Sequence, residues 1–291
     1  MEDQRTTTRL TNVVAVTENV PEAGIISWWT LSGVVNADAL RNAWTTAGLD
    51  PKLCPDNPSP ECALHRAVKE LGERRKLVRP LGKSKGWSVV DELAIGDNLD
   101  YVQGVSAKVD IAGRVTVEPA DHPRAAEILG AYQTHLDHLA TTDISTLLTR
   151  MASAVSAVGL RDTGGIYFIP RNRLDEWRKI VGAIRSVSSH NIYEVPALAS
   201  DEAVRAILDA IEREAATDAT ALEEALDSDS IGARALESRA QHCAEIEAKV
   251  ADYEELLGKS LESLTTRLAS LRARLAEAAL AKVAEAEKAN A

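Results

Sequence analysis

The feature that most constrains this chain is a seam of apolar residues in its last third. Between residues 236 and 275 apolar side chains recur at alternating steps of three and four, which keeps them on one side of a helix. A helix cannot bury such a stripe by itself, so the pattern requires a partner helix, folded back from the same chain or supplied by another copy. The seam comprises Cys243, Ile246, Val250, Tyr253, Leu257, Leu261, Leu264, Leu268, Leu271 and Leu275.

The spacing predicts one long helix from about Ser230 to near the end of the chain. Its seam has one irregularity, two successive steps of four between Val250 and Leu261, which locally unwinds a left-handed supercoil. The irregularity falls at Gly258, a weak helix former. We predict that the seam residues from 246 to 275 mediate self-association, so the expected partner is a second copy or another helix.

Charge and composition narrow the class of protein. The net charge is −11, and residues 198–291 hold 20 acidic against 11 basic side chains, a balance of −9. Such acidic helices are usually solvated. Three cysteines argue against a secreted disulfide scaffold. The N-terminus lacks a signal-peptide core, and no apolar run has membrane-spanning length, so we expect a cytoplasmic protein without membrane contact.

The first half of the chain alternates between helical and strand patterns. Asn36 is a plausible N-cap and Gly48 a stop for a helix over 37–47. Ser59 followed by Pro60 starts a second helix, over 60–72. The apolar period then becomes two, which predicts an antiparallel meander over 77–118.

The second half of the head predicts two helices and one strand–helix–strand unit. Two helical stripes follow Pro123, and the pair Gly164–Gly165 leads into an apolar strand over 166–169. A helix and a second strand over 192–195 complete a βαβ unit with a right-handed crossover. The fold class is therefore α+β: a mixed or antiparallel sheet head with packed helices and one βαβ unit, followed by a long C-terminal helical, coiled-coil tail.

These patterns divide the chain into four regions. We expect a flexible N-terminus over 1–11 and an α+β subdomain with winged-helix-like element order over 12–119. A helical pair with the βαβ unit follows over 120–197, and the acidic tail occupies 198–291.

One basic stretch is a candidate nucleic-acid surface. Residues 66–85 carry eight Lys and Arg against two acidic residues, in the position of a recognition helix and wing. Solvated charge on an exposed helix and turn explains the same pattern, because the chain as a whole is acidic. The residues that would contact phosphates are Arg66, Lys69, Arg74, Arg75, Lys83 and Lys85.

Metal and catalytic motifs are weak. Cys54, Cys62 and His65 have wide spacing for zinc, and His135 and His138 are expected to flank a buried stripe in solvent. The pair Gly164–Gly165 precedes a strand, whereas a phosphate loop follows one. No nucleophile–base motif has a supporting signature. We therefore expect no metal and no cofactor, and catalytic residues stay unknown.

Two stretches carry a family resemblance. Residues 36–81, NADALRNAWTTAGLDPKLCPDNPSPECALHRAVKELGERRKLVRPL, and residues 159–170, GLRDTGGIYFIP, resemble an uncharacterised family of proteins from actinobacteria, archaea and their phages or mobile elements. The resemblance implies a phage or mobile-element setting and assigns no activity.

Three functions follow as expectations. The first is a non-enzymatic assembly or interaction protein that self-associates through its C-terminal helix. The second is a nucleic-acid-binding protein that uses the basic helix and hairpin. The third is a hydrolase or nuclease whose carboxylate site the sequence does not identify.

Overall fold

The computed structural model describes residues 21–72, 76–82, 85–95, 98–161, 164–226 and 233–289. The expected flexible segment 1–11 lies outside these ranges. The chain forms two compact units, each built from segments distant in sequence. The first unit takes its described residues from Met1–Trp29, Thr149–Arg178 and Ile192–Ala291, and the second from Thr30–Leu148 and Lys179–Asn191. The α+β class is confirmed, with antiparallel sheets and packed C-terminal helices.

The sheet of the first unit has the strand order β10-β1-β9-β8. Strand β1 pairs antiparallel with β9, with Ile26 opposite Phe168. The Ala199 backbone N–H donates to the Pro21 carbonyl oxygen at 2.8 Å, so the end of β10 lies beside the start of β1 and this pair is also antiparallel. Strands β9 and β10 therefore run parallel, with β1 between them. The strands are β1 (Glu22–Thr30), β8 (Val158–Gly159), β9 (Ile166–Pro170) and β10 (Asn191–Leu198).

Two helices complete a β-α-β-β-α-β order. Helix α5 (Thr141–Ala154) lies between β1 and β8 in sequence, and α6 (Leu174–Ser186) follows the short helix η2 (Arg171–Arg173) between β9 and β10. With strand order 4-1-3-2, this is the ferredoxin-like, split βαβ arrangement. The expected βαβ unit is confirmed in its elements, but β1 separates its two strands because both form their hydrogen-bonded ladders with β1.

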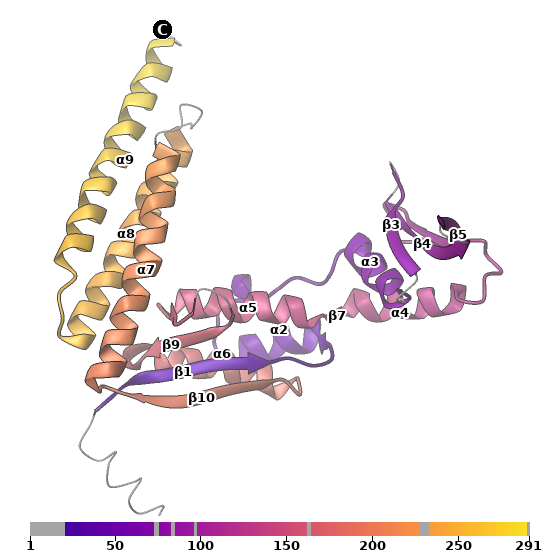
Figure 1. Ribbon diagram of the computed structural model, residues 1–291, viewed down its shortest axis with the longest axis horizontal. Helices are drawn as coiled ribbons and strands as arrows, with labels where there is room; N and C mark the ends of the chain where they lie inside the picture. Colours follow the sequence, from indigo (N-terminus) through magenta and orange to yellow (C-terminus); the bar gives the residue numbers. More distant parts are fainter. Residues whose placement is uncertain are drawn as a thin grey trace, which may run out of the picture. The chain divides into compact units, whose positions relative to one another are not determined.

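The tail is a bundle of helices, drawn side by side in Figure 1. It comprises α7 (Asp201–Leu226), α8 (Ala233–Leu257) and α9 (Glu262–Ala289). The single long helix expected from residue 230 onward is wrong, because the chain turns back after Leu257. Gly258 takes a φ of 63° there, a left-handed conformation that costs glycine little. The seam irregularity thus marks a hairpin turn. No helix among the described residues is long and apolar enough to span a membrane.

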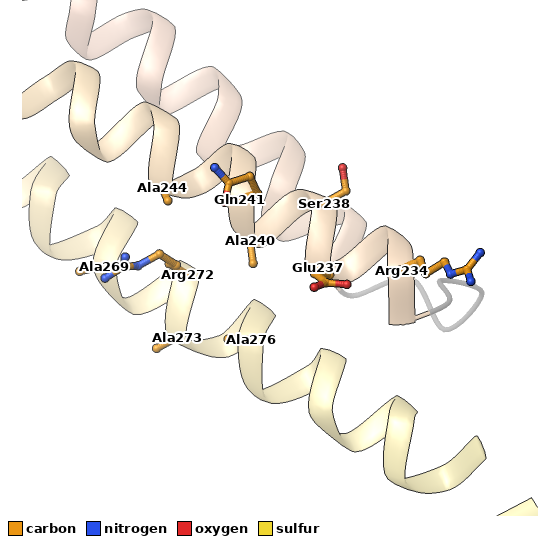
Figure 2. A pocket seen from close by; sticks show the side chains of 10 residues that line it. All are labelled: Arg234, Glu237, Ser238, Ala240, Gln241, Ala244, Ala269, Arg272, Ala273 and Ala276. Atoms are coloured by element: carbon orange, nitrogen blue, oxygen red, sulfur yellow. The ribbon is translucent and has the colours of Figure 1, made fainter. Parts of the chain in front are cut away.

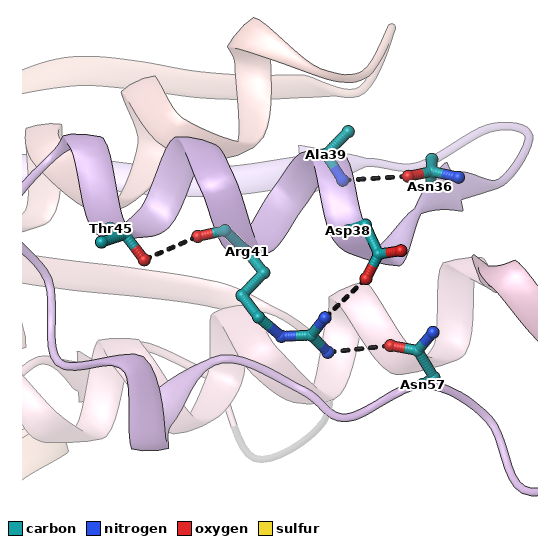
Figure 3. Close-up of polar contacts among 6 residues, drawn as sticks. All are labelled: Asn36, Asp38, Ala39, Arg41, Thr45 and Asn57. Atoms are coloured by element: carbon teal, nitrogen blue, oxygen red, sulfur yellow. Dashed lines mark hydrogen bonds and ion pairs between the residues drawn. The ribbon is translucent and has the colours of Figure 1, made fainter.

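Helix α2 (Ala37–Thr46) begins the second unit's helices and anchors a loop. The Asn36 side chain accepts a hydrogen bond from the Ala39 backbone N–H at 2.9 Å, confirming the expected N-cap. Arg41 donates to Asp38 at 2.6 Å and to Asn57 at 2.8 Å (Figure 3). The proline-rich segment containing the short helix η1 (Pro51–Leu53) is thereby tied to α2. Strand β2 (Val35–Asn36) pairs with β7 (His138–Leu139).

The meander is confirmed as a four-stranded antiparallel sheet in chain order. Helices α3 (Pro60–Glu70) and α4 (Ala125–Asp137) share a core with it that includes Leu64, Val105 and Tyr132 and no residue of α2. The element order of a winged helix is present, but the core around α3 is made with α4 and the sheet. The strands are β3 (Lys76–Pro80), β4 (Gly86–Ile95), β5 (Asn98–Val109) and β6 (Val115–Glu118).

Candidate functional site

A polar cleft of about 550 Å³ lies in the first unit, between α7, α8 and the turn that follows α5. Basic and acidic side chains share its walls, so it has no single sign of charge. Its lining includes Arg150, Ser153, Ser156, Arg173, Glu214, Asp218, His242, Glu245, Lys249 and Asp252. Of these residues the sequence points only to Arg173, as a candidate anion contact at the start of a helix, and to His242, as a distant fourth ligand for a zinc site at Cys54, Cys62 and His65.

Lys249 is the centre of this cleft. Its ammonium group donates to Glu214 Oε1 at 2.6 Å and to the Ala157 carbonyl oxygen at 2.7 Å. One turn further along α8, the Tyr253 hydroxyl donates to the Ser156 carbonyl oxygen at 2.7 Å. Ser156 has a φ of 57°, uncommon for a residue with a Cβ. Two side chains of α8 therefore bind the backbone carbonyl groups of the turn between α5 and β8.

Asp218 is the titratable group with a shifted pKa in the cleft. Partial burial raises the pKa of its carboxyl, and the negative charge of Glu214, four residues earlier on α7, raises it further. His242 and Lys249 oppose this shift. Among the described side chains no group of three or more His, Cys, Asp or Glu is placed to hold a metal ion.

We predict that Asp218→Asn stabilises the protein at neutral pH. A raised folded-state pKa means that stability is greatest below the unfolded value and falls as pH rises through the folded value. The Asn side chain does not ionise, so the variant avoids that loss. The expected gain in the free energy of unfolding is under about 1 kcal/mol, because water still reaches the site. Thermal unfolding at pH 7 and at pH 3.5 measures the effect, which should shrink at the lower pH. Equal destabilisation by Asp218→Asn at both values would contradict it.

A second site is a groove of about 760 Å³ between α8 and α9. In Figure 2, Ala240 and Ala244 on α8 lie across from Ala269, Ala273 and Ala276 on α9, so small apolar side chains form half of the lining, and Ser238 and Gln241 add polar groups. Charged groups at its rim include Arg234, Glu237 and Arg272.

The groove continues into an exposed apolar stripe on α9. Leu280 is 72% exposed and Val283 is 46% exposed. With Ala269, Ala273 and Ala276 they follow steps of four, three, four and three, the spacing of a helix contact. At about 100° per residue this stripe lies roughly 140° around α9 from the inner seam of Leu264, Leu268, Leu271 and Leu275. Helix α9 thus has two apolar faces, and the heptad spacing of the second was the sequence signal for it.

The inner seam lies in the core of one chain. Ile246, Val250, Tyr253, Leu264, Leu268, Leu271 and Leu275 are buried, and Leu257 and Leu261 pack against them half-buried. Their cluster includes Phe168 of β9 and residues of α7. The partner that the seam required is supplied by the chain itself, which leaves these residues little area for a second copy.

The candidate basic residues are placed unequally. Arg66 pairs with Asp143 at 2.7 Å and is only 18% exposed, so its guanidinium is held inside the fold. Lys85 is exposed and pairs with Glu61 at 3.3 Å, and Lys69 is exposed on α3. Arg74, Arg75 and Lys83 lie outside the described residues.

The cysteine and histidine residues considered as metal ligands take part in packing and hydrogen bonding within the fold. Cys54 is buried, and the His65 ring stacks on Trp87 at 5.1 Å. His135 is 5% exposed and its Nε2 lies 2.8 Å from Glu70 Oε1. The expectation that His135 flanks the stripe in solvent is wrong, because Ile128, Tyr132 and His135 form the buried face of α4.

Comparison with known proteins places the chain in a family. It belongs to the family of unknown function DUF6744, whose model matches residues 24–286. No curated protein matches it, and no solved structure matches it. The matched region includes most of both compact units, the helical bundle of the first unit among them.

Proposed function

We propose that this protein is a non-enzymatic assembly protein that self-associates through the outer face of α9. The carrying observation is the second apolar stripe on that helix, which the core of the bundle does not use. The inner face of α9 is already packed, so Leu280 and Val283 contribute no buried apolar area within one chain. Burial of such side chains against a partner would stabilise an interface.

The other two functions have less support. Of the basic residues described, Arg66 and Lys85 are already paired with carboxylates. Among the described residues that line the polar cleft, no hydroxyl group is hydrogen-bonded to a histidine or carboxylate, and Lys249 is engaged by Glu214 and a backbone carbonyl. A phage or mobile-element setting is part of the proposal, supported by the resemblance of residues 36–81 and 159–170.

The test is the oligomeric state of the whole chain. Light scattering should show a dimer or larger species between about 1 and 100 μM, a concentration range that covers the dissociation constants of weak interfaces. Leu280→Asp with Val283→Asp should convert it to a monomer. The melting temperature of this variant should equal that of the dissociated wild type at low concentration, because both side chains are exposed within one chain. Ser270→Asp, also exposed on α9 and off the stripe, is the matched control. A wild-type monomer at 100 μM would refute self-association.

A further inference from the structure

Helix α9 extends past the rest of its bundle. The Cys243 thiol lies 3.4 Å from the Leu268 carbonyl oxygen, and α8 runs antiparallel to α9. The first residue of α8, Ala233, is ten residues before Cys243 and is therefore level with about residue 278 of α9. Arg267 pairs with Glu223 at 2.7 Å, so α7 ends, at Leu226, level with about residue 270. Leu280 and Val283 thus lie beyond the described ends of both helices, and Figure 1 shows α9 extending past them.

The stripe on α9 is graded in size along the helix. Its first three members, Ala269, Ala273 and Ala276, are small, and its last two, Leu280 and Val283, are large. The small members line the groove with α8, and the large ones lie on the projecting end. One half of the stripe is therefore a recess and the other half a projection.

A second copy of this chain has the complementary shape if the two α9 helices run antiparallel. A two-fold axis near Ala276 sets Leu280 and Val283 of one copy against Ala273 and Ala269 of the other. Each large side chain then meets a small one, which is the condition for close helix packing without voids. A parallel pair would instead set Leu280 against Leu280 and Ala273 against Ala273, and leave the grooves empty.

We propose that two copies exchange the projecting ends of α9, each end filling the groove between α8 and α9 of the other copy. This inference rests on the proposed self-association and names its geometry. The contact is isologous, so it closes at two copies. The dimer is built on two grooves and four large apolar side chains.

Single-cysteine variants of the full chain test the geometry under mild oxidation. Ala276→Cys should form a disulfide-linked dimer, because a residue on a two-fold axis meets its own copy within disulfide reach. Leu280→Cys alone should not, whereas a mixture of Ala269→Cys and Val283→Cys chains should link to each other. The wild type is the control for the native cysteines, of which Cys54 and Cys243 are buried and Cys62 is half-buried.

Filling the groove gives an independent readout. Ala269→Gln with Ala273→Gln should weaken association at least tenfold, and Ala251→Gln, exposed on α8 away from the groove, should not. Efficient linkage of Leu280→Cys to itself would mean parallel helices and would overturn the inference. A dimer that Leu280→Asp dissociates but groove filling leaves intact would also overturn it, with the proposed function still standing. A monomeric wild type would contradict both the proposed self-association and its antiparallel geometry.

Discussion

Phe168→Ala is expected to lower the free energy of unfolding by about 3–5 kcal/mol, as truncation of a buried aromatic does. Phe168 is fully buried, opposite Ile26 on β1. Its ring lies 6.1 Å from that of Tyr253 on α8. A Cβ at Gly24 would come within 2.9 Å of the Phe168 ring, so the ring packs directly on a residue that has no side chain to move into the space it leaves. The cost should therefore fall at the upper end of that range.

Chemical denaturation of the whole chain measures this loss. The matched control is Tyr193→Ala on β10, since Tyr193 is 41% exposed and stacks on Trp28 at 5.2 Å on the same sheet. It should cost about 1 kcal/mol, mainly the stacking contact. Equal losses for the two variants would mean that Phe168 does not join the sheet to the bundle.

The central strand and its helix could be predicted from sequence because their signals are local. Phe168 lies in the apolar strand over 166–169, and Trp177, Ile180 and Ile184 recur at helical spacing after it. All four are buried, and Ile166 is half-buried. The glycine pair is required for backbone shape and close packing. Gly164 has a φ of 96°, and a Cβ at Gly165 would lie 3.3 Å from the Trp29 ring.

The split of the βαβ unit could not be predicted. Strand β1 separates β9 from β10 although about 110 residues, including the whole meander, lie between β1 and α5 in sequence. Strand pairing over such a separation depends on which apolar faces meet, and apolar period alone does not encode it. A pattern of strand–helix–strand therefore identifies the crossover but not the strand inserted into it.

The tail shows the same limit in another form. The seam predicted that its apolar residues are buried together, and the burial of Val250 on α8 and Leu268 on α9 confirms this. Reading it as one helix failed because the pattern continues through a turn: a hairpin whose two arms pack together has the same steps of three and four. The glycine in the irregularity was the signal that separates the two cases.

The polar cleft could not be predicted from the sequence, because distant parts of the chain form it. Its hydrogen bonds join residues 35, 92 and 97 positions apart, and none of its members stands in a local motif. Only the spacing of Glu214 and Asp218 on α7 is a sequence signal, and paired carboxylates on a helix are usually solvated.

Lys249→Met is expected to destabilise the protein by about 2–3 kcal/mol, because removing one partner of a partly buried pair leaves the other charge uncompensated. Lys249 is 16% exposed and Glu214 is 39% exposed, so water still reaches the carboxylate and limits the loss. The variant also frees the Ala157 carbonyl oxygen. Because Lys249 lowers the pKa of Asp218, its removal should raise that pKa further. The loss of stability should then grow from pH 4 to pH 7 as the Asp218 carboxyl ionises without the Lys249 charge beside it.

Urea unfolding across that pH range checks this, with Lys259→Met, an exposed lysine just after α8, as the matched control. Adding Glu214→Gln to Lys249→Met should recover at least half of the lost stability at pH 7, because the amide carries no charge to compensate. If the loss comes instead from the carbonyl contact, the double variant will be no more stable than Lys249→Met and the pH dependence will be flat. Lys249 would then act as a hydrogen-bond donor to the strained turn at Ser156, and Tyr253 would share that role through its hydroxyl.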